Sequence, residues 1–164
     1  MRLVGSDSIL SSMWDLRWPL GAALVLTLGA PPARAALGER EESVGRDRRA
    51  LAAVDRGTEE SGGYRVHELE KGATTVREFV SADGIVFAVA WSGIAHPDLR
   101  PLLGAFHEEY RAAARAARGA EGRRARRVAG ERVVVESWGH PRDLHGRAYV
   151  PALLPSGVTV DELR

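Results

Sequence analysis

Cysteine is absent from all 164 residues of the chain, which excludes disulfides, thiol catalysis and thiolate metal sites. An excess of one charge is absent too, because 23 Lys and Arg residues balance 22 Asp and Glu residues. A nearly neutral protein has no overall field that would steer it toward nucleic acid or anionic lipid. We therefore expect no nucleic-acid partner.

Lysine is almost absent, since Lys71 is the only one and the other residues with a permanent positive charge are arginines. Together with abundant alanine and glycine, this composition indicates GC-rich coding and gives the arginine count little functional weight. The densest basic run, between Arg111 and Arg127, also lacks the interleaved aromatic residues that stack on bases. We interpret this run as a solvated helix end and loop.

Long hydrophobic runs are missing except near the start of the chain. Residues 20–30 carry no charge, follow a short segment with both charge signs, and stop at Pro31-Pro32. This run is shorter than the roughly 20 apolar residues that span a bilayer. Ala33-Arg34-Ala35 then places small residues at the two positions that a signal peptidase reads.

These features predict a secretory signal peptide over residues 1–35, cleaved before Ala36. A start at Met13 instead of Met1 would make the signal more compact. We expect an exported protein, in the periplasm or at the cell surface, with no membrane span after cleavage. The alternative is an apolar N-terminal helix that stays docked on the domain.

Residues 36–63 are mostly polar and show one weak helical pattern. Ser43 can cap a helix that places Val44, Leu51 and Val54 on one side, and Gly57 ends the pattern. Because this apolar stripe is thin, we interpret the segment as a weakly helical N-terminal arm in front of the domain.

Three β-rich runs follow, joined by short glycine-containing turns that are typical of hairpins. The third run has no polar face, so we expect it to be buried on both sides. Phe87, Val89 and Trp91 would place bulk on one of its faces, and the small residues of the other face would let a helix lie close. These runs span residues 64–70, 74–80 and 85–91.

The clearest helix signal begins at Pro97-Asp98 and continues to Ala113, with apolar residues at the spacing of one helical face. A charged connector over residues 119–127 separates this helix from two further strands, expected at residues 131–138 and 147–150. The order β-β-β-α-β-β predicts a single α+β domain over residues 64–164. Its antiparallel sheet should have about five strands, with one long helix packed on one face.

Four segments together carry a family resemblance: Val66-His-Glu-Leu69, Val76-Arg-Glu-Phe-Val-Ser-Ala-Asp-Gly-Ile-Val-Phe-Ala-Val-Ala-Trp91, Pro97-Asp-Leu-Arg-Pro-Leu-Leu-Gly104 and Gly146-Arg-Ala-Tyr-Val-Pro-Ala-Leu-Leu-Pro-Ser-Gly-Val158. They resemble an uncharacterised family of short exported bacterial proteins, known only as a domain of unknown function. The resemblance covers nearly all of the mature chain. It implies export from a bacterium of the Gram-negative type and a single domain, and it implies no activity, substrate or cofactor.

The densest polar cluster runs from Glu136 to His145. Glu136 and His140 are a carboxylate and an imidazole that can act as general base and acid. With Asp143 and His145 they also offer oxygen and nitrogen ligands to a metal. Motif spacing for a metal is absent, and hydrogen bonding to the local backbone at a hairpin end is the plainer interpretation. We therefore predict no metal site and no cofactor.

A second acid–base pair is conceivable across the first hairpin, between His67 and Glu78. The available nucleophiles, Ser81 and Ser137, lie outside any Gly-x-Ser-x-Gly elbow. Cross-strand ion pairing, which stabilises a fold by only about 0–1 kcal/mol at the surface, explains the same residues without chemistry.

Aromatic and basic residues near the strand ends are the candidate binding residues. Their rings could line a groove for a ligand or a peptide, although packing in the core or at its rim explains them as well. Exposed strand edges could also recruit another chain by adding a strand to the sheet. The candidates are Trp91, Trp138, Arg142, Arg147 and Tyr149.

The sequence thus favours a non-catalytic binding or adaptor module of the bacterial envelope, whose partner protein or ligand it does not identify. The alternative is a small periplasmic hydrolase that uses His140 and Glu136. An enzyme is expected to bring these two side chains together in one pocket. An adaptor is expected to show an open sheet edge or an apolar patch.

Overall fold

The computed structural model describes residues 36–117 and 125–164, apart from the side chains of residues 125 and 126. The signal peptide expected over residues 1–35 lies outside these ranges, as does most of the expected connector. The strands are β1 (Val54–Ser61), β2 (Tyr64–Lys71), β3 (Thr74–Ser81), β4 (Val86–Gly93), β5 (Ala125–Ala129), β6 (Val134–His140) and β7 (Asp143–Tyr149). The helices are η1 (Glu41–Ser43), α1 (Val44–Leu51), α2 (Leu99–Leu103), η2 (Gly104–Phe106), α3 (His107–Ala116), η3 (Pro151–Leu153) and η4 (Val160–Glu162).

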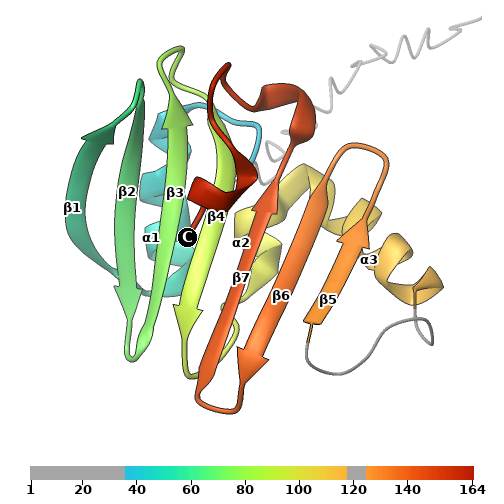
Figure 1. The fold of residues 1–164 in the computed structure, drawn as a ribbon. Helices are drawn as coiled ribbons and strands as arrows, with labels where there is room; N and C mark the ends of the chain where they lie inside the picture. Colours follow the sequence, from blue (N-terminus) through green and yellow to red (C-terminus); the bar gives the residue numbers. More distant parts are fainter. Residues whose placement is uncertain (1–35, 118–124) are drawn as a thin grey trace, which may run out of the picture. The chain divides into compact units, whose positions relative to one another are not determined.

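All seven strands of the described residues form one sheet in the order β1-β2-β3-β4-β7-β6-β5, and every neighbouring pair is antiparallel. The helices α1, α2 and α3 lie behind this sheet in Figure 1, while the chain after β7 returns across its front. The expected α+β architecture with an antiparallel sheet is therefore confirmed. The number of strands and the form of the helix differ from the prediction.

Two edge strands account for the difference from the five expected strands. Every residue of β1 is exposed, so its sequence carries no alternating apolar pattern, and it joins the sheet by backbone pairing to β2. At the other edge, β5 begins inside the arginine-rich segment that we had expected to be a connector. Both strands are recognised by their hydrogen-bonded neighbours and not by their own hydrophobic pattern.

The segment before β1 is part of the fold, which corrects the expectation of an N-terminal arm. Ala36, Leu37, Val44 and Leu51 are all buried in the core on the helix side of the sheet. The helix α1 lies where the weak pattern indicated, but Ser43 makes no capping hydrogen bond and its side chain is buried. A thin apolar stripe is sufficient here because the helix is short and only one side of it contacts the sheet.

The single long helix of the prediction is broken in two. Gly104 adopts φ 41° and ψ −110°, outside the helical region, and the 3₁₀ turn η2 follows before α3 begins. Leu102 and Leu103 before the break are fully buried, whereas α3 has no buried residue. The break lets α2 pack tightly on the sheet while α3 continues along the surface.

A bulge in β4 decides which residues face the helices. Val80 pairs with Val86 and Phe79 with Ala88, so Phe87 is an extra residue on this strand. Val86, Val89 and Trp91 consequently belong to the core under the helices, while Phe87 belongs to the core on the other face. The helices therefore lie on the face with the bulky residues, and the expectation that they would cover the small residues was wrong. Every residue from Val86 to Trp91 is buried, as expected.

The front face of the sheet is only partly covered. Leu154, Val158, Val160 and Leu163 from the chain after β7 pack against an aromatic cluster on this face. The rings of Tyr64, Phe79 and Phe87 form that cluster, with centroids 5.8–6.2 Å apart. The remainder of the front face stays open toward the β6–β7 turn, and this opening positions the candidate site.

The described residues contain no helix that is both long enough and apolar enough to cross a membrane.

Candidate functional site

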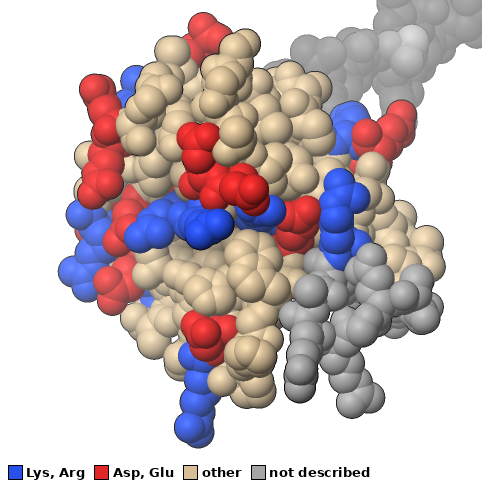
Figure 2. Space-filling model, in the orientation of Figure 1, with Lys and Arg blue, Asp and Glu red and all other residues tan. Residues whose placement is uncertain are grey.

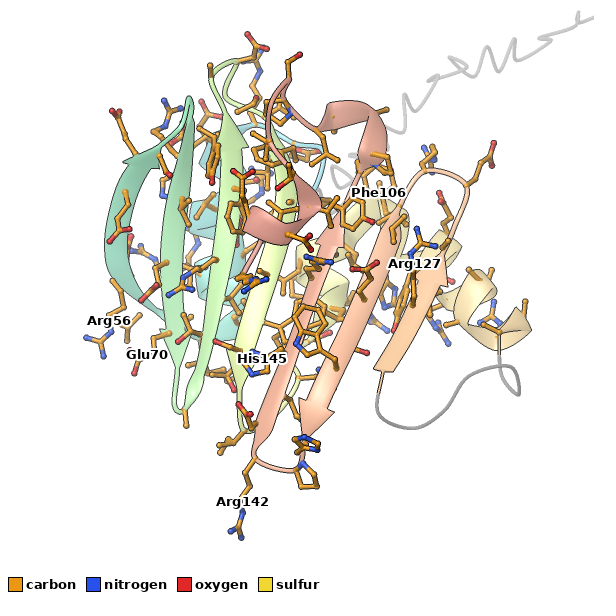
Figure 3. All side chains as sticks on the ribbon, in the orientation of Figure 1. Arg56, Glu70, Phe106, Arg127, Arg142 and His145 are labelled. Carbon is orange, nitrogen blue, oxygen red and sulfur yellow. The ribbon has the colours of Figure 1, made fainter. Side chains whose placement is uncertain are left out.

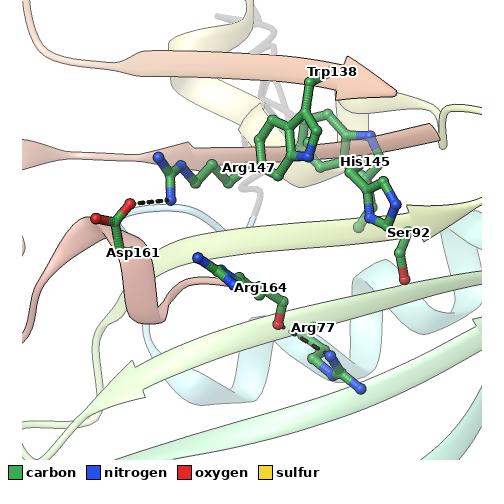
Figure 4. A pocket seen from close by; sticks show the side chains of 9 residues that line it. Arg77, Ser92, Trp138, His145, Arg147, Asp161 and Arg164 are labelled. Carbon is green, nitrogen blue, oxygen red and sulfur yellow. Dashed lines mark hydrogen bonds and ion pairs between the residues drawn. The ribbon is translucent and has the colours of Figure 1, made fainter. Parts of the chain in front are cut away.

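A groove of about 540 Å³ lies on the open part of the front face, between the sheet and the end of the chain (Figure 4). We call it the open-face groove. Figure 2 shows arginines and acidic residues side by side across the middle of this face. The groove is lined by Arg77, Trp91, Ser92, Trp138, His145, Gly146, Arg147, Asp161 and Arg164.

An aromatic stack forms one wall of the open-face groove. Trp138 on β6 and His145 on β7 are cross-strand partners, and their rings are nearly parallel, at 11°, with centroids 6.0 Å apart. His145 Nε2 also lies 2.9 Å from the Asp143 carboxylate. Side chains two residues apart on a strand share a face, so this wall extends in line with the Arg147 side chain.

Arg147 ties the end of the chain to the sheet. Its Nε donates to Glu136 at 2.6 Å, and its Nη1 donates to the Val160 carbonyl oxygen at 2.5 Å. Asp161 lies 3.6 Å from the same Nη1, and the guanidinium stands over the Trp138 ring at 5.4 Å from its centroid. This arginine is mostly buried and has several partners, so it is a structural as well as a lining residue.

Two further arginines come from elements far apart in the sequence. Arg77 on β3 donates to Glu68 at 2.8 Å and to the Arg164 backbone oxygen at 3.1 Å. The Arg164 side chain itself makes no hydrogen bond or ion pair with the described residues, and it lies at the rim of the groove (Figure 4). It is therefore a cationic group available to a bound molecule.

The strands under the groove require a glycine. Trp91 is buried, and its indole N–H donates to His96 Nδ1 at 3.0 Å. A Cβ atom added at Gly146, its cross-strand partner, would stand 2.2 Å from a carbon of the Trp91 ring. Only glycine fits at this position, because the ring occupies the space of a side chain.

The two catalytic candidates are not brought together. Glu136 is engaged by Arg127 at 3.1 Å and by Arg147 at 2.6 Å. His140 is exposed at the end of the same strand, four residues on, which is about 13 Å along a strand. Neither residue lines the open-face groove. The described residues also contain no group of three or more potential metal ligands.

Three of the five binding candidates, Trp91, Trp138 and Arg147, line the open-face groove. Tyr149 is buried in the front core instead. Arg142 lies in the β6–β7 turn with a left-handed φ of 72° and points away from the sheet (Figure 3).

The sequence did not single out Arg77, Ser92, Asp161 or Arg164 as groove residues. They come from β3, β4 and the end of the chain, so the pairing of β3 with β4 and the return of the chain after β7 bring them together. His145 was considered as a metal ligand, and its neighbour in the structure is an indole ring. Alternation along β7 could have placed it on the same face as Arg147.

The second acid–base pair is also not formed. His67 and Glu78 are cross-strand partners, but the His67 ring lies 2.7 Å from Glu41 and 2.8 Å from the Thr58 hydroxyl. Glu78 instead lies on the helix side of the sheet with none of its surface exposed. Neither of its carboxyl oxygens has a hydrogen-bond partner among the described residues.

A second buried acid, which the sequence did not reveal, accompanies Glu78. Asp47 on α1 is 2% exposed and accepts a hydrogen bond from the Ala36 backbone N–H at 3.1 Å. Burial raises the pKa of Asp47 to about 7. Burial, and then the charge of Asp47, raises the pKa of Glu78 to about 8. A carboxyl without a charged partner in the interior keeps its proton in this way.

The open edge strand β1 is protected against pairing with another chain. Its register shifts between Asp55 and Gly57, and most of its side chains are polar or charged. Bulges and charges on an edge strand are the usual means by which a sheet avoids adding further strands. This edge therefore gives little support to recruitment of a partner strand.

Comparison with known proteins places the chain in a family. Residues 33–163 match the model of a family described as a protein of unknown function (DUF2844), so the chain belongs to that family. This confirms the resemblance to an uncharacterised family. No curated protein and no solved structure matches the chain.

Proposed function

We propose that this DUF2844 protein is an exported binding protein, without catalytic activity, that holds an anionic ligand in the open-face groove. The observation that carries the proposal is the Arg164 guanidinium, which has no protein partner among the described residues and stands at the rim of a groove with an aromatic wall. A groove that offers both a cation and an aromatic wall suits a charged group attached to an apolar or ring-shaped body.

Export is supported by the N-terminal sequence. An uncharged run over residues 20–30 and small residues at Ala33 and Ala35 are typical of a cleaved signal peptide. The family match begins at residue 33, next to the expected cleavage site. A ligand would therefore be met outside the cytoplasm, in the periplasm or at the cell surface.

The ligand class follows from the charges along the groove. Arg77, Arg147 and Arg164 line it together with a single acidic side chain, Asp161. Glu68 and Glu136 already engage the first two arginines, whereas the Arg164 guanidinium has no hydrogen-bond or ion-pair partner among the described residues. Ser92 adds a hydroxyl group that can donate a hydrogen bond. A single carboxylate or phosphate group suits this set.

A hydrolase built on His140 and Glu136 has less support. The two side chains are separated along β6, and Glu136 is held by two arginines. A general base must reach the proton that it abstracts, which requires the two groups to meet at the substrate.

Intrinsic fluorescence tests the proposal directly. The protein that starts at Ala36 retains only two tryptophans: Trp138, whose ring forms a wall of the open-face groove, and the buried Trp91 beneath it. We would titrate this protein with glucuronate, with glucose 6-phosphate and with glucose. Both anionic sugars, or one of them, should change the tryptophan emission in a saturable way, and neutral glucose should not.

Arg164→Gln should weaken this binding about tenfold, since it removes the positive charge without breaking a hydrogen bond or ion pair to the described residues. Arg142→Gln is the matched control, because Arg142 is an exposed arginine outside the groove, and it should bind like the unaltered protein. Equal binding by both variants, or no saturable response to either anion, would contradict the proposal.

A further inference from the structure

The helix side of the sheet contains a polar cluster that the open-face groove does not explain. It consists of the Ala36 backbone nitrogen with the side chains of Asp47 and Glu78, and we call it the buried acid cluster. The buried Ser43 precedes Asp47 by about one turn of α1. Ala36 and Glu78 are 0% exposed, and Ser43 and Asp47 are nearly so. The Ala36 nitrogen lies 3.1 Å from Asp47 Oδ2.

Hydrogen-bond donors are missing from the buried acid cluster. Both Glu78 oxygens and the Ser43 hydroxyl lack a partner among the described residues. Buried polar atoms are rarely left without a partner, because desolvation then costs free energy with no return. Two carboxyl groups share this interior site, and the Ala36 amide offers them only one N–H. A group with several donors and a positive charge would complete the cluster.

Other charged groups around the cluster do not fill this role. Arg46, which pairs with Glu39 at 3.3 Å, lowers the pKa of Asp47 through its charge, and Glu39 raises it. His67, the cross-strand partner of Glu78, is engaged with Glu41 and Thr58. The missing cation therefore does not come from any of these neighbouring side chains.

The Ala36 nitrogen is held at this place by the backbone that follows it. The amide of Leu37 donates to the Leu102 carbonyl oxygen at 3.2 Å, and the amide of Gly38 donates to the Val86 carbonyl oxygen at 2.8 Å. These bonds join the segment to α2 and to the start of β4. The position of the nitrogen is thus set by the folded domain.

We propose that the buried acid cluster is the binding site for the chain's own processed N-terminus, with the Ala36 ammonium group paired to Asp47. This inference rests on the export and cleavage included in the proposed function. A peptidase that cleaves after Ala-x-Ala adds water across the Ala35–Ala36 bond. Ala35 leaves as a carboxylate, and the Ala36 nitrogen becomes an amine that takes up a proton at neutral pH.

Cleavage changes the chemistry of this nitrogen at a fixed position. An amide carries one N–H and no charge, whereas an ammonium group carries three N–H donors and one positive charge. One ammonium group neutralises one carboxylate, and Asp47 is already at hydrogen-bond distance. Glu78 then remains protonated at neutral pH, in line with its pKa of about 8. Before processing, the site is neutral only while Asp47 keeps its proton; after processing, the ammonium group balances the charge of ionised Asp47.

The burial of Ala36 also determines the order of signal-peptide cleavage and folding. A peptidase needs an extended, accessible substrate, and the residue after the cleaved bond is fully buried in the folded domain. Cleavage should precede folding, and a domain that folds with its signal still attached should resist later cleavage at this bond.

The chain offers an internal reference for a test, because Lys71 is the only lysine. We would express the full chain, purify the exported protein, sequence its N-terminus and treat it with acetic anhydride. The mature protein then has two reactive amines: the exposed Lys71 side chain and the Ala36 terminus. Relative to urea-unfolded protein, acetylation of Ala36 should be at least tenfold slower in the folded state, and that of Lys71 should change less than twofold.

Asp47→Asn separates ion pairing from burial alone. In this variant the folded Ala36 amine should titrate at least one pH unit lower than in the unaltered protein, where the ion pair should hold its pKa above about 8, the reference for an α-amine. Asp55→Asn, at an exposed aspartate, is the matched control and should leave the titration unchanged. Glu78→Gln keeps the experiment informative if Asp47→Asn fails to fold, and it should shift the same titration by a smaller amount.

An N-terminus other than Ala36, equal acetylation in folded and unfolded protein, or a titration that none of these variants moves would overturn the inference. None of these results bears on anion binding at the open-face groove. Loss of sugar binding in Arg164→Gln, conversely, leaves the amine titration unchanged, so the two proposals fail separately.

Discussion

Acidic residues lie in opposite environments on the two faces of the sheet. On the front face, Glu68 and Glu136 are held by arginines at 2.6–3.1 Å, and these ion pairs are partly open to water. Under the helices, Asp47 and Glu78 are buried and have no hydrogen-bonded cation among the described residues. Exposed pairs can exchange with solvent or ligand at small free-energy cost, whereas enclosed acids cannot. The front face is therefore suited to binding, and the helix side requires a partner supplied by the chain itself.

The largest expected loss of stability comes from truncating an aromatic residue in the core on either face of the sheet. Phe87→Ala removes a fully buried ring that contacts Tyr64 and Phe79, so the free energy of unfolding should fall by about 3–5 kcal/mol. Phe106 is only half-buried on the helix side, and Phe106→Ala should cost about half as much. Urea denaturation measures both. Equal losses would mean that the front core is not the better packed of the two.

Glu78→Gln should remove a pH dependence from the stability. Burial raises the pKa of the Glu78 carboxyl from 4.5 to about 8. The folded protein is therefore most stable while Glu78 is protonated in both the folded and the unfolded state, and it loses stability as the pH rises from about 4.5 toward 8. Between pH 6 and pH 8 the ionisation of Glu78 should lower the free energy of unfolding of the unaltered protein by about 2 kcal/mol, and Glu78→Gln should lack this loss.

The same urea titrations on Glu60→Gln provide the control, since Glu60 lies on the exposed strand β1. Asp47, Arg46, Glu39 and His67 surround the buried acids and remain in both variants. Parallel stability curves for Glu78→Gln and the unaltered protein would show that Glu78 is not an enclosed, unpaired acid.

Glu136→Gln should have a smaller effect, because Arg127, one of its two partners, is exposed to water. It weakens the ion pairs to Arg127 and Arg147, and the free energy of unfolding should fall by about 1 kcal/mol at neutral pH. The loss should shrink in 1 M salt, where exposed charges are screened. A loss above 3 kcal/mol that is independent of salt would place Glu136 among enclosed charges and would break the contrast between the faces.

The smallest effect on stability is expected for Arg164→Gln. The side chain makes no hydrogen bond or ion pair with the described residues, so the free energy of unfolding should change by less than about 0.5 kcal/mol. Thermal unfolding should confirm this before the variant is used in sugar titrations. A clear destabilisation would mean that Arg164 has a structural partner.

Elements with a hydrophobic signal of their own could be predicted from the sequence. The strands β2, β3 and β4 were found within two residues at each end, because alternation and short turns define them. The edge strands β1 and β5 were missed, since exposed or arginine-rich residues carry no such pattern. The bulge at Phe87 was missed as well, and this single extra residue reversed the face on which the helices lie.

The candidate site depends on contacts between distant residues, and this limits what the sequence can show. Trp91, Trp138 and Arg147 were proposed from their types, but Arg164 reaches the groove only because the end of the chain folds back over the sheet. The buried acid cluster joins Ala36, α1 and β3. An aspartate in a polar helix such as Asp47 resembles a solvated residue until the packing of that helix is known.

Acetylation can remove the positive charge of the Ala36 amine without changing any other group. It therefore tests whether this charge, created by cleavage of the signal peptide, stabilises the buried acid cluster. In a Lys71→Arg background the mature protein has one amine, which can be acetylated in urea before the protein is refolded. When only an amide faces Asp47, its pKa is about 7, so the folded protein becomes less stable as this carboxyl ionises. Between pH 5 and pH 8 the free energy of unfolding of the acetylated protein should therefore fall by about 2 kcal/mol more than that of the free-amine protein. Urea denaturation at these two pH values gives the answer. Identical pH dependence of the two proteins would contradict the account.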